Sequence, residues 1–150
     1  MNFKKSQSGR SMVEMLGVLA IIGVLSVGGI SGYTISMRKH RANGVIDTVS
    51  KYGLVAYAEC QRKLLSGEIH ISGAVCGVDR VMSFADAGVG SLPSGVTKIE
   101  VDYVYLDSQV GYDHADIKTT FSDSKLCQAT ASTIGSTCVN NMVMVNLKYY

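Results

Sequence analysis

The chain has 150 residues, enough for one globular domain with a membrane segment and too few for two domains. Its formal net charge of +2 is unevenly spread: residues 1–41 hold six Lys/Arg and one acid, whereas residues 42–150 hold eight Lys/Arg and eleven acids. The larger part therefore has a net charge of −3, which excludes nucleic acid as the default partner.

The first predicted element is a long apolar helix that follows a short basic leader, residues 1–9. No charged residue occurs from Met15 to Met37. A helix over this stretch is about 34 Å long, enough to cross a hydrocarbon core of about 30 Å. One carboxylate, Glu14, lies at the start of the helix. Because a lone charge is costly in lipid, we expect Glu14 to have a partner.

Three interpretations explain this stretch. A secretory signal peptide fits the basic leader and the small residues Ser26-Val27-Gly28, but the apolar run is long and has Glu14 inside its start. A plain membrane anchor explains the span and leaves Glu14 unexplained. Third, the segment Gly9-Arg10-Ser11-Met12-Val13-Glu14-Met15-Leu16 resembles the processing site of type IV pilins and of the pseudopilins of type II secretion, with glycine, glutamate and apolar run at the same spacing.

The resemblance covers roughly Lys4 to Tyr33 and implies processing by a prepilin peptidase. The peptidase would cut between Gly9 and Arg10 and methylate the new terminal amine of Arg10, and Glu14 would become the fifth residue of the mature chain. Two positions depart from the family pattern. Arg10 stands where the family usually has an apolar residue. Many pilins also have a proline midway along the helix, whereas the only proline of this chain, Pro93, lies outside it.

The same resemblance implies where the chain acts and with what. The leader would lie in the cytoplasm, residues 10–37 in the bacterial inner membrane with its lipid, and the head, residues 38–150, outside. An inner-membrane assembly platform and motor would build a helical homopolymer in which Glu14 meets the terminal amine of a neighbouring copy. The alternatives are a pseudopilin in a periplasmic pseudopilus, and a minor pilin that captures DNA or a surface.

The helix is predicted to run from about Ser11 to Leu65. Gly28 and Gly32 form a small-xxx-small pair that permits close packing of helices in lipid, unless these glycines are merely tolerated there. The basic residues 38–41 mark the exit from the membrane and suit headgroups. Beyond them an apolar stripe predicts an amphipathic half, and Ser66-Gly67 predicts its end; the stripe comprises Val45, Val49, Tyr52, Ala56 and Cys60.

The remaining sequence predicts a small antiparallel sheet, and hence an α+β fold with the helix laid across one face of the sheet. Residues 66–97 are irregular and rich in glycine, apart from one helical turn at Ser83–Asp86. Strands are expected at 99–106, 117–121 and 142–147, with a short helix at 123–133. Alternation predicts a common face for four residues of the first strand, Ile99, Val101, Tyr103 and Tyr105.

The four cysteines predict a disulfide framework, as in small exported domains. Three connectivities are open, and we favour Cys60–Cys76 and Cys127–Cys138 because each pair is close in sequence. The alternative is four reduced, buried thiols, the expected state of a domain that faces the cytoplasm.

Signals for catalysis are poor, so we expect no enzyme, no metal and no cofactor. The histidines, residues 40, 70 and 114, are scattered, and His114 between Asp113 and Asp116 fits a surface turn better than a metal site or a base. Ser122 and Lys125 match an S-x-x-K pattern, but the companion motifs of serine acyl enzymes are missing. Tyrosines cluster towards the carboxyl end, where they fill a core edge or form a contact surface; they are residues 103, 105, 112, 149 and 150.

Overall fold

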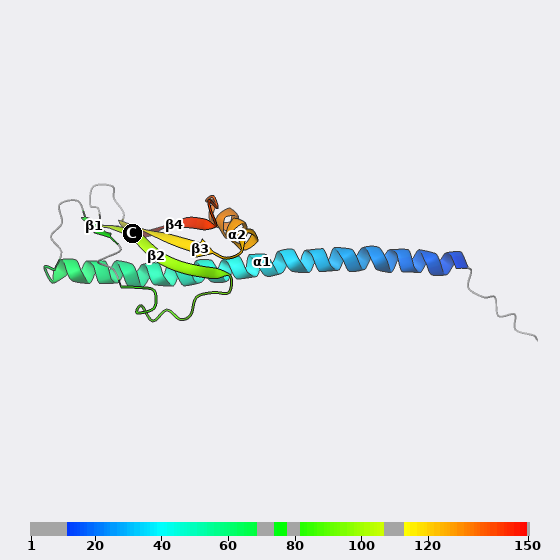
Figure 1. Ribbon diagram of the computed structural model, residues 1–150, viewed down its shortest axis with the longest axis horizontal. Coiled ribbons are helices and arrows are strands. Elements are labelled where there is room, and N and C mark those ends of the chain that lie inside the picture. Colours follow the sequence, from blue (N-terminus) through cyan, green and yellow to red (C-terminus); the bar gives the residue numbers. More distant parts are fainter. Residues whose placement is uncertain (1–11, 69–73, 78–81, 107–112, 150) are drawn as a thin grey trace, which may run out of the picture. The chain divides into compact units, whose positions relative to one another are not determined.

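The computed structural model describes residues 12–68, 74–77, 82–106 and 113–149 (Figure 1). In chain order the elements are α1 (Met12–Leu65), β1 (Ala74–Gly77), β2 (Val96–Leu106), β3 (Asp113–Phe121), α2 (Ser124–Ile134) and β4 (Met142–Tyr149). The chain divides into two compact units, Met1–Met37 and Arg38–Tyr150. The predicted leader, with the cleavage and methylation positions Gly9 and Arg10, lies outside the described residues.

The long helix ends where the sequence predicts. Gly67 has a φ of 73°, which glycine adopts without strain. The amide of Glu68 donates to the carbonyl of Lys63 at 3.1 Å, and the amide of Gly67 donates to the carbonyl of Leu64 at 3.1 Å. This pair of bonds is the Schellman motif, which satisfies the last carbonyl groups of a helix.

The second unit has the predicted α+β fold, with an antiparallel sheet in the order β1-β2-β3-β4. The three predicted strands are present, and each extends beyond the residue range that its alternating pattern predicts. Strand β1 was not predicted, because its four residues are too few to show an alternating pattern. It pairs with the end of β2, where Cys76 lies opposite Val104.

A bulge in β2 corrects the predicted face of that strand. Val101 pairs with Ile117, but Tyr103, two residues later, pairs with the adjacent Asp116. The extra residue reverses the alternation beyond it. Val104 is therefore fully buried and Tyr103 is 43% exposed, so Tyr103 does not share the core face of Ile99 and Val101.

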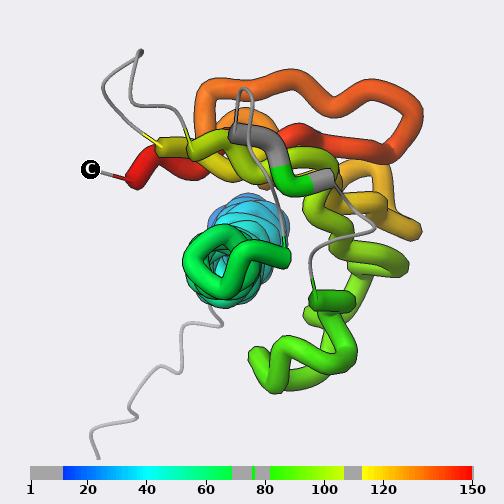
Figure 2. Tube along the Cα trace, turned by 90° about the vertical axis from the view of Figure 1, so that its left-hand side faces the viewer, coloured from blue at the N-terminus to red at the C-terminus, as the bar shows by residue number. Residues whose placement is uncertain are grey.

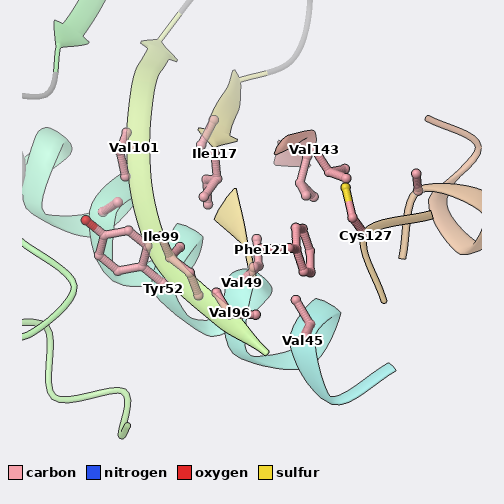
Figure 3. Close-up of a cluster of buried hydrophobic side chains, with 14 of the residues drawn as sticks. Val45, Val49, Tyr52, Val96, Ile99, Val101, Ile117, Phe121, Cys127 and Val143 are labelled. Carbon is pink, nitrogen blue, oxygen red and sulfur yellow. The ribbon is translucent and has the colours of Figure 1, made fainter. Parts of the chain in front are cut away.

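The core forms between the carboxyl half of α1 and one face of the sheet. Figure 2, viewed along α1, shows the strands on one side of the helix, with residues 82–95 passing beside it. The predicted stripe of α1 is buried from Val45 to Cys60. Figure 3 shows Val45, Val49 and Tyr52 of the helix facing apolar side chains of the sheet; these are Val96, Ile99, Val101, Ile117, Phe121 and Val143.

Gly53 allows α1 to approach the sheet closely. A Cβ atom at this position would overlap the Leu147 side chain and lie 2.7 Å from the Tyr149 hydroxyl and 2.9 Å from the Ile117 Cδ1 atom. Gly44, nine residues earlier in the same helix, has no described atom within 4 Å of such a Cβ apart from the helix's own nearby backbone. The two glycines therefore differ in surroundings while sharing the same backbone conformation.

This difference predicts opposite effects of alanine at the two positions. Gly44→Ala should raise the free energy of unfolding by about 1 kcal/mol, the difference in helix propensity. Gly53→Ala gains the same term, but overpacking costs about 1–3 kcal/mol, so we expect a net loss of up to about 2 kcal/mol. Urea unfolding of both variants in detergent, followed by near-ultraviolet circular dichroism, measures this. An equal gain in both variants would contradict the close approach at Gly53.

Candidate functional site

The first unit presents an apolar helix whose described side chains are exposed from Met12 to Ser36. Its large apolar side chains from Met12 to Ile35 are between 53% and 84% exposed. These residues lie on every side of the helix and not along one stripe, which is typical of a helix surrounded by lipid or by other helices. Among the described residues, α1 is the one helix long and apolar enough to cross a membrane.

Three hydroxyl side chains of this segment donate hydrogen bonds within the helix itself. The Ser26 hydroxyl donates to the Ile22 carbonyl at 2.8 Å, and the Ser31 hydroxyl donates to the Gly28 carbonyl at 2.9 Å. Thr34 likewise donates to the Ser31 carbonyl at 2.9 Å. A hydrocarbon environment requires such bonds, because no water is present to replace them.

Glu14 is the one charged side chain in the described part of this unit and lies in the first turn of α1. The partial positive charge of the helix amino terminus favours a carboxylate there. No ion pair joins Glu14 to another described residue. A carboxylate in an apolar surface requires a cation or donor from outside the described part of this unit.

Gly28 and Gly32 leave a strip of bare backbone on the helix. Apart from the neighbouring backbone of the helix, no atom of the described residues lies within 4 Å of a Cβ built at either position. The strip is therefore free of intramolecular packing, as close contact with a second helix would require.

The second unit carries the two disulfides that we favoured from the sequence, Cys60–Cys76 and Cys127–Cys138. The first joins the end of α1 to β1, and both of its cysteines are fully buried. The second joins α2 to the segment that precedes β4. The interpretation of four reduced thiols is therefore wrong for this structure.

Two stacked tyrosines form a contact between the end of β4 and α1. The rings of Tyr57 and Tyr149 stack with centroids 4.4 Å apart. The Tyr57 hydroxyl donates to the Asp113 Oδ2 atom at 2.6 Å, and this bond raises the pKa of Tyr57. Burial raises the pKa of Tyr149 to about 12. Tyr149 thus fills a core edge, whereas Tyr103 is exposed, and the predictions for Tyr112 and Tyr150 lie outside the described residues.

The weak catalytic candidates lie in regular elements or in hydrogen bonds that shape the fold. His114 belongs to β3 and not to a turn, because the strand begins at Asp113; its ring stacks on Tyr105 with centroids 4.4 Å apart. Ser122 donates its hydroxyl to the Gly95 carbonyl at 3.3 Å, while the Asp123 side chain caps α2 by accepting from the Lys125 amide at 2.9 Å. Within the described ranges no three His, Cys, Asp or Glu side chains are grouped to hold a metal. His40 is exposed on α1, and residue 70 lies outside the described part.

Comparison of the chain with protein-family models, with curated proteins and with solved structures gives no match. Three features of the chain bear on its function: the apolar helix exposed on every side, the single carboxylate in the described part of that unit, and the disulfide-linked head.

Proposed function

We propose that this chain is a structural subunit of a type IV pilus or a related filament, and not an enzyme. The observation that supports this most strongly is an apolar helical surface, exposed on every side, whose one charge is Glu14 in the first turn. A simple anchor needs the apolar surface but not the carboxylate. A subunit that packs against copies of itself uses both.

In this proposal the amino-terminal helix has two successive environments. Before assembly it lies in the inner membrane, with the amino terminus in the cytoplasm and the head outside. During assembly, lipid contacts are exchanged for contacts with neighbouring helices, and the bare backbone at Gly28 and Gly32 permits close packing. Extraction of the helix from lipid requires work, which an assembly motor and its membrane platform supply.

Glu14 sets the register between neighbours in this assembly. Its partner is the terminal amine that a prepilin peptidase exposes at Arg10. Two opposite charges in a dry bundle attract strongly at short distance, but each is costly when left alone. Any axial offset between neighbouring subunits that separates the two charges therefore costs free energy. This penalty selects one arrangement of the helices, which the apolar contacts alone do not specify.

Analysis of the mature amino terminus tests the proposal. We expect purified protein to begin at Arg10 and to carry a methylated terminal amine. Gly9→Val should leave the chain uncut, whereas Gly17→Val, at a glycine inside α1, should leave processing intact. Mature protein that begins at Met1, or that has lost the whole apolar helix, would contradict the proposal.

The location of the processed protein then separates two members of the class. A surface pilus subunit should appear in filaments sheared from intact cells. A pseudopilin should remain in the cell envelope after the same treatment. The disulfides of the head are compatible with both locations, because the periplasm and the cell exterior are oxidising.

A further inference from the structure

A shallow depression lies on the head where α1 meets the loop that leads into β2. Its volume is about 380 Å³. One wall belongs to two turns of α1, and the other belongs to the loop. The lining residues are His40, Arg41, Gly44 and Thr48 from the helix, and Ser91, Leu92, Pro93 and Ser94 from the loop.

The loop that forms the outer wall is fixed at both ends. At its start, the Tyr52 hydroxyl donates to the Met82 carbonyl at 2.8 Å, and the Tyr52 and Phe84 rings meet edge to face with centroids 5.2 Å apart. At its end, the Ser122 amide donates to the Gly95 carbonyl at 3.0 Å. The depression is therefore built by anchored segments of the head.

The helix side of the depression has an excess of positive charge. Arg38, Lys39 and Arg41 are exposed, and no described acid forms an ion pair with any of them. The nearest acid along the helix, Asp47, is already paired with Lys51 at 2.7 Å. Among the described residues that line the depression there is no carboxylate. Of the three cations, Arg41 alone lines it.

The opposite wall supplies hydrogen-bond donors. The hydroxyl groups of Ser91 and Ser94 are exposed and make no hydrogen bond to the described part of the chain. Thr48, in contrast, donates its hydroxyl to the Gly44 carbonyl at 2.9 Å. An arginine and two serine hydroxyls that line the same depression suit a phosphate group, whose oxygens accept several hydrogen bonds at once.

The position of Arg41 in the sequence favours a lipid headgroup as the source of such a phosphate. Along α1, Arg41 follows Met37, the last residue of the uncharged stretch, by four residues. Four residues of helix rise about 6 Å. The headgroup region on each side of the hydrocarbon core has a thickness of about 5–8 Å. A cation at this point is level with lipid phosphates when the apolar helix spans a bilayer.

We propose that the depression binds the phosphodiester headgroup of an anionic phospholipid. Arg41 holds the phosphate, Ser91 and Ser94 donate to its oxygens, and Leu92 and Pro93 contact the apolar part of the glycerol. The site fixes the head on the membrane surface before assembly. This inference rests on insertion of the helix into a membrane and does not depend on processing or polymerisation.

Native mass spectrometry of the full-length protein tests the site. The protein is released from nanodiscs that contain equal amounts of phosphatidylcholine and phosphatidylglycerol. We expect one phosphatidylglycerol molecule to be retained in preference to phosphatidylcholine, and Arg41→Gln to reduce this retention roughly tenfold through loss of a charge-assisted bond. Lys39→Gln removes the same charge from the same basic segment but outside the depression, and should retain the lipid. Equal losses in both variants would show diffuse attraction only and would overturn the proposal.

A second variant blocks the depression without changing its charge. Gly44→Leu places a side chain where no atom of the chain lies within 4 Å of the Cβ position, so the fold should persist. We expect it to reduce phosphatidylglycerol retention as strongly as Arg41→Gln does. Unchanged retention in a folded Gly44→Leu protein would overturn the proposal.

Inorganic phosphate distinguishes a lipid site from a general phosphate site. It is titrated against the detergent-solubilised protein without lipid, and binding is followed through the NMR signal of the Arg41 side chain. We expect no saturable binding at millimolar phosphate, because the lipid is also held by its apolar contacts. Saturable binding of free phosphate that Arg41→Gln abolishes would overturn the assignment to a membrane lipid.

Discussion

Replacing both Cys127 and Cys138 with alanine should lower the free energy of unfolding of the head by about 3 kcal/mol. The two cysteines are 11 residues apart, and a crosslink over such a loop removes many conformations from the unfolded chain. For the Cys60–Cys76 bridge, which spans 16 residues, the same relation gives about 3 kcal/mol. Either loss is a large share of the stability of a domain of this size.

Urea unfolding of the full-length protein in detergent, followed by the near-ultraviolet circular dichroism of the tyrosines, measures both losses. Reduction opens both bridges and keeps the sulfur atoms, so the reduced wild-type protein controls for the shape change at alanine in a variant with all four cysteines replaced. If the loss arises in the unfolded chain, reduction and substitution should have similar effects. A loss below about 1 kcal/mol on reduction would contradict the loop-closure account.

Opening the two bridges should also loosen different elements of the head. Cys76 lies in β1, a strand of four residues that pairs with β2 alone. Opening Cys60–Cys76 therefore removes the covalent tie of an edge strand. Cys127 is buried in α2, which packs beside β3 and β4 in the core. We accordingly expect faster amide exchange in β1 for the first variant and in α2 for the second.

Strong periodicity made much of the fold predictable from the sequence. The stripe from Val45 to Cys60 repeats at helical spacing, and the structure buries it. The start of α2 was predictable from Asp123, whose side chain caps the helix. The disulfide pairing followed from the short separations between the cysteines. In each of these cases the residues that determine the structure are neighbours in the sequence.

The features that could not be predicted depend on contacts between distant residues. The bulge that exposes Tyr103 and buries Val104 depends on how β2 is aligned with β3. Gly53 has the sequence signature of a helix-weakening residue, and only the neighbouring Leu147 and Ile117 side chains show that its small size is required. His114 lies among turn-forming residues, yet pairing with β2 and β4 extends β3 to include it.

The candidate sites differ in the same way. Glu14 was identifiable because a charge interrupts a long apolar pattern, which needs no knowledge of the fold. The depression near Arg41 was not identifiable, because its second wall, around Ser91 and Ser94, is some fifty residues away in sequence. The one available signal was the basic segment, which alone indicates headgroups in general and not a defined site.

Replacing Glu14 with glutamine should abolish filament formation while leaving a processed protein held in the membrane. The substitution keeps the shape of the side chain and removes its charge. In the proposed assembly it strands the terminal amine of the neighbouring subunit in a dry bundle, which costs about 3–5 kcal/mol per contact. Since this cost recurs at every subunit added, even the lower value is enough to prevent growth of a polymer.

Asp47→Asn is the matched control for this variant. Asp47 also belongs to α1, but it is exposed on the head and its ion pair with Lys51 contributes little. Both variants lose one negative charge from the same helix, so a general charge effect would impair both. We expect normal filaments from Asp47→Asn and none from Glu14→Gln, as judged by the protein in sheared and membrane fractions. Filaments of normal yield from processed Glu14→Gln protein would exclude the role assigned to this carboxylate. Glu14 would then not set the alignment of neighbouring helices.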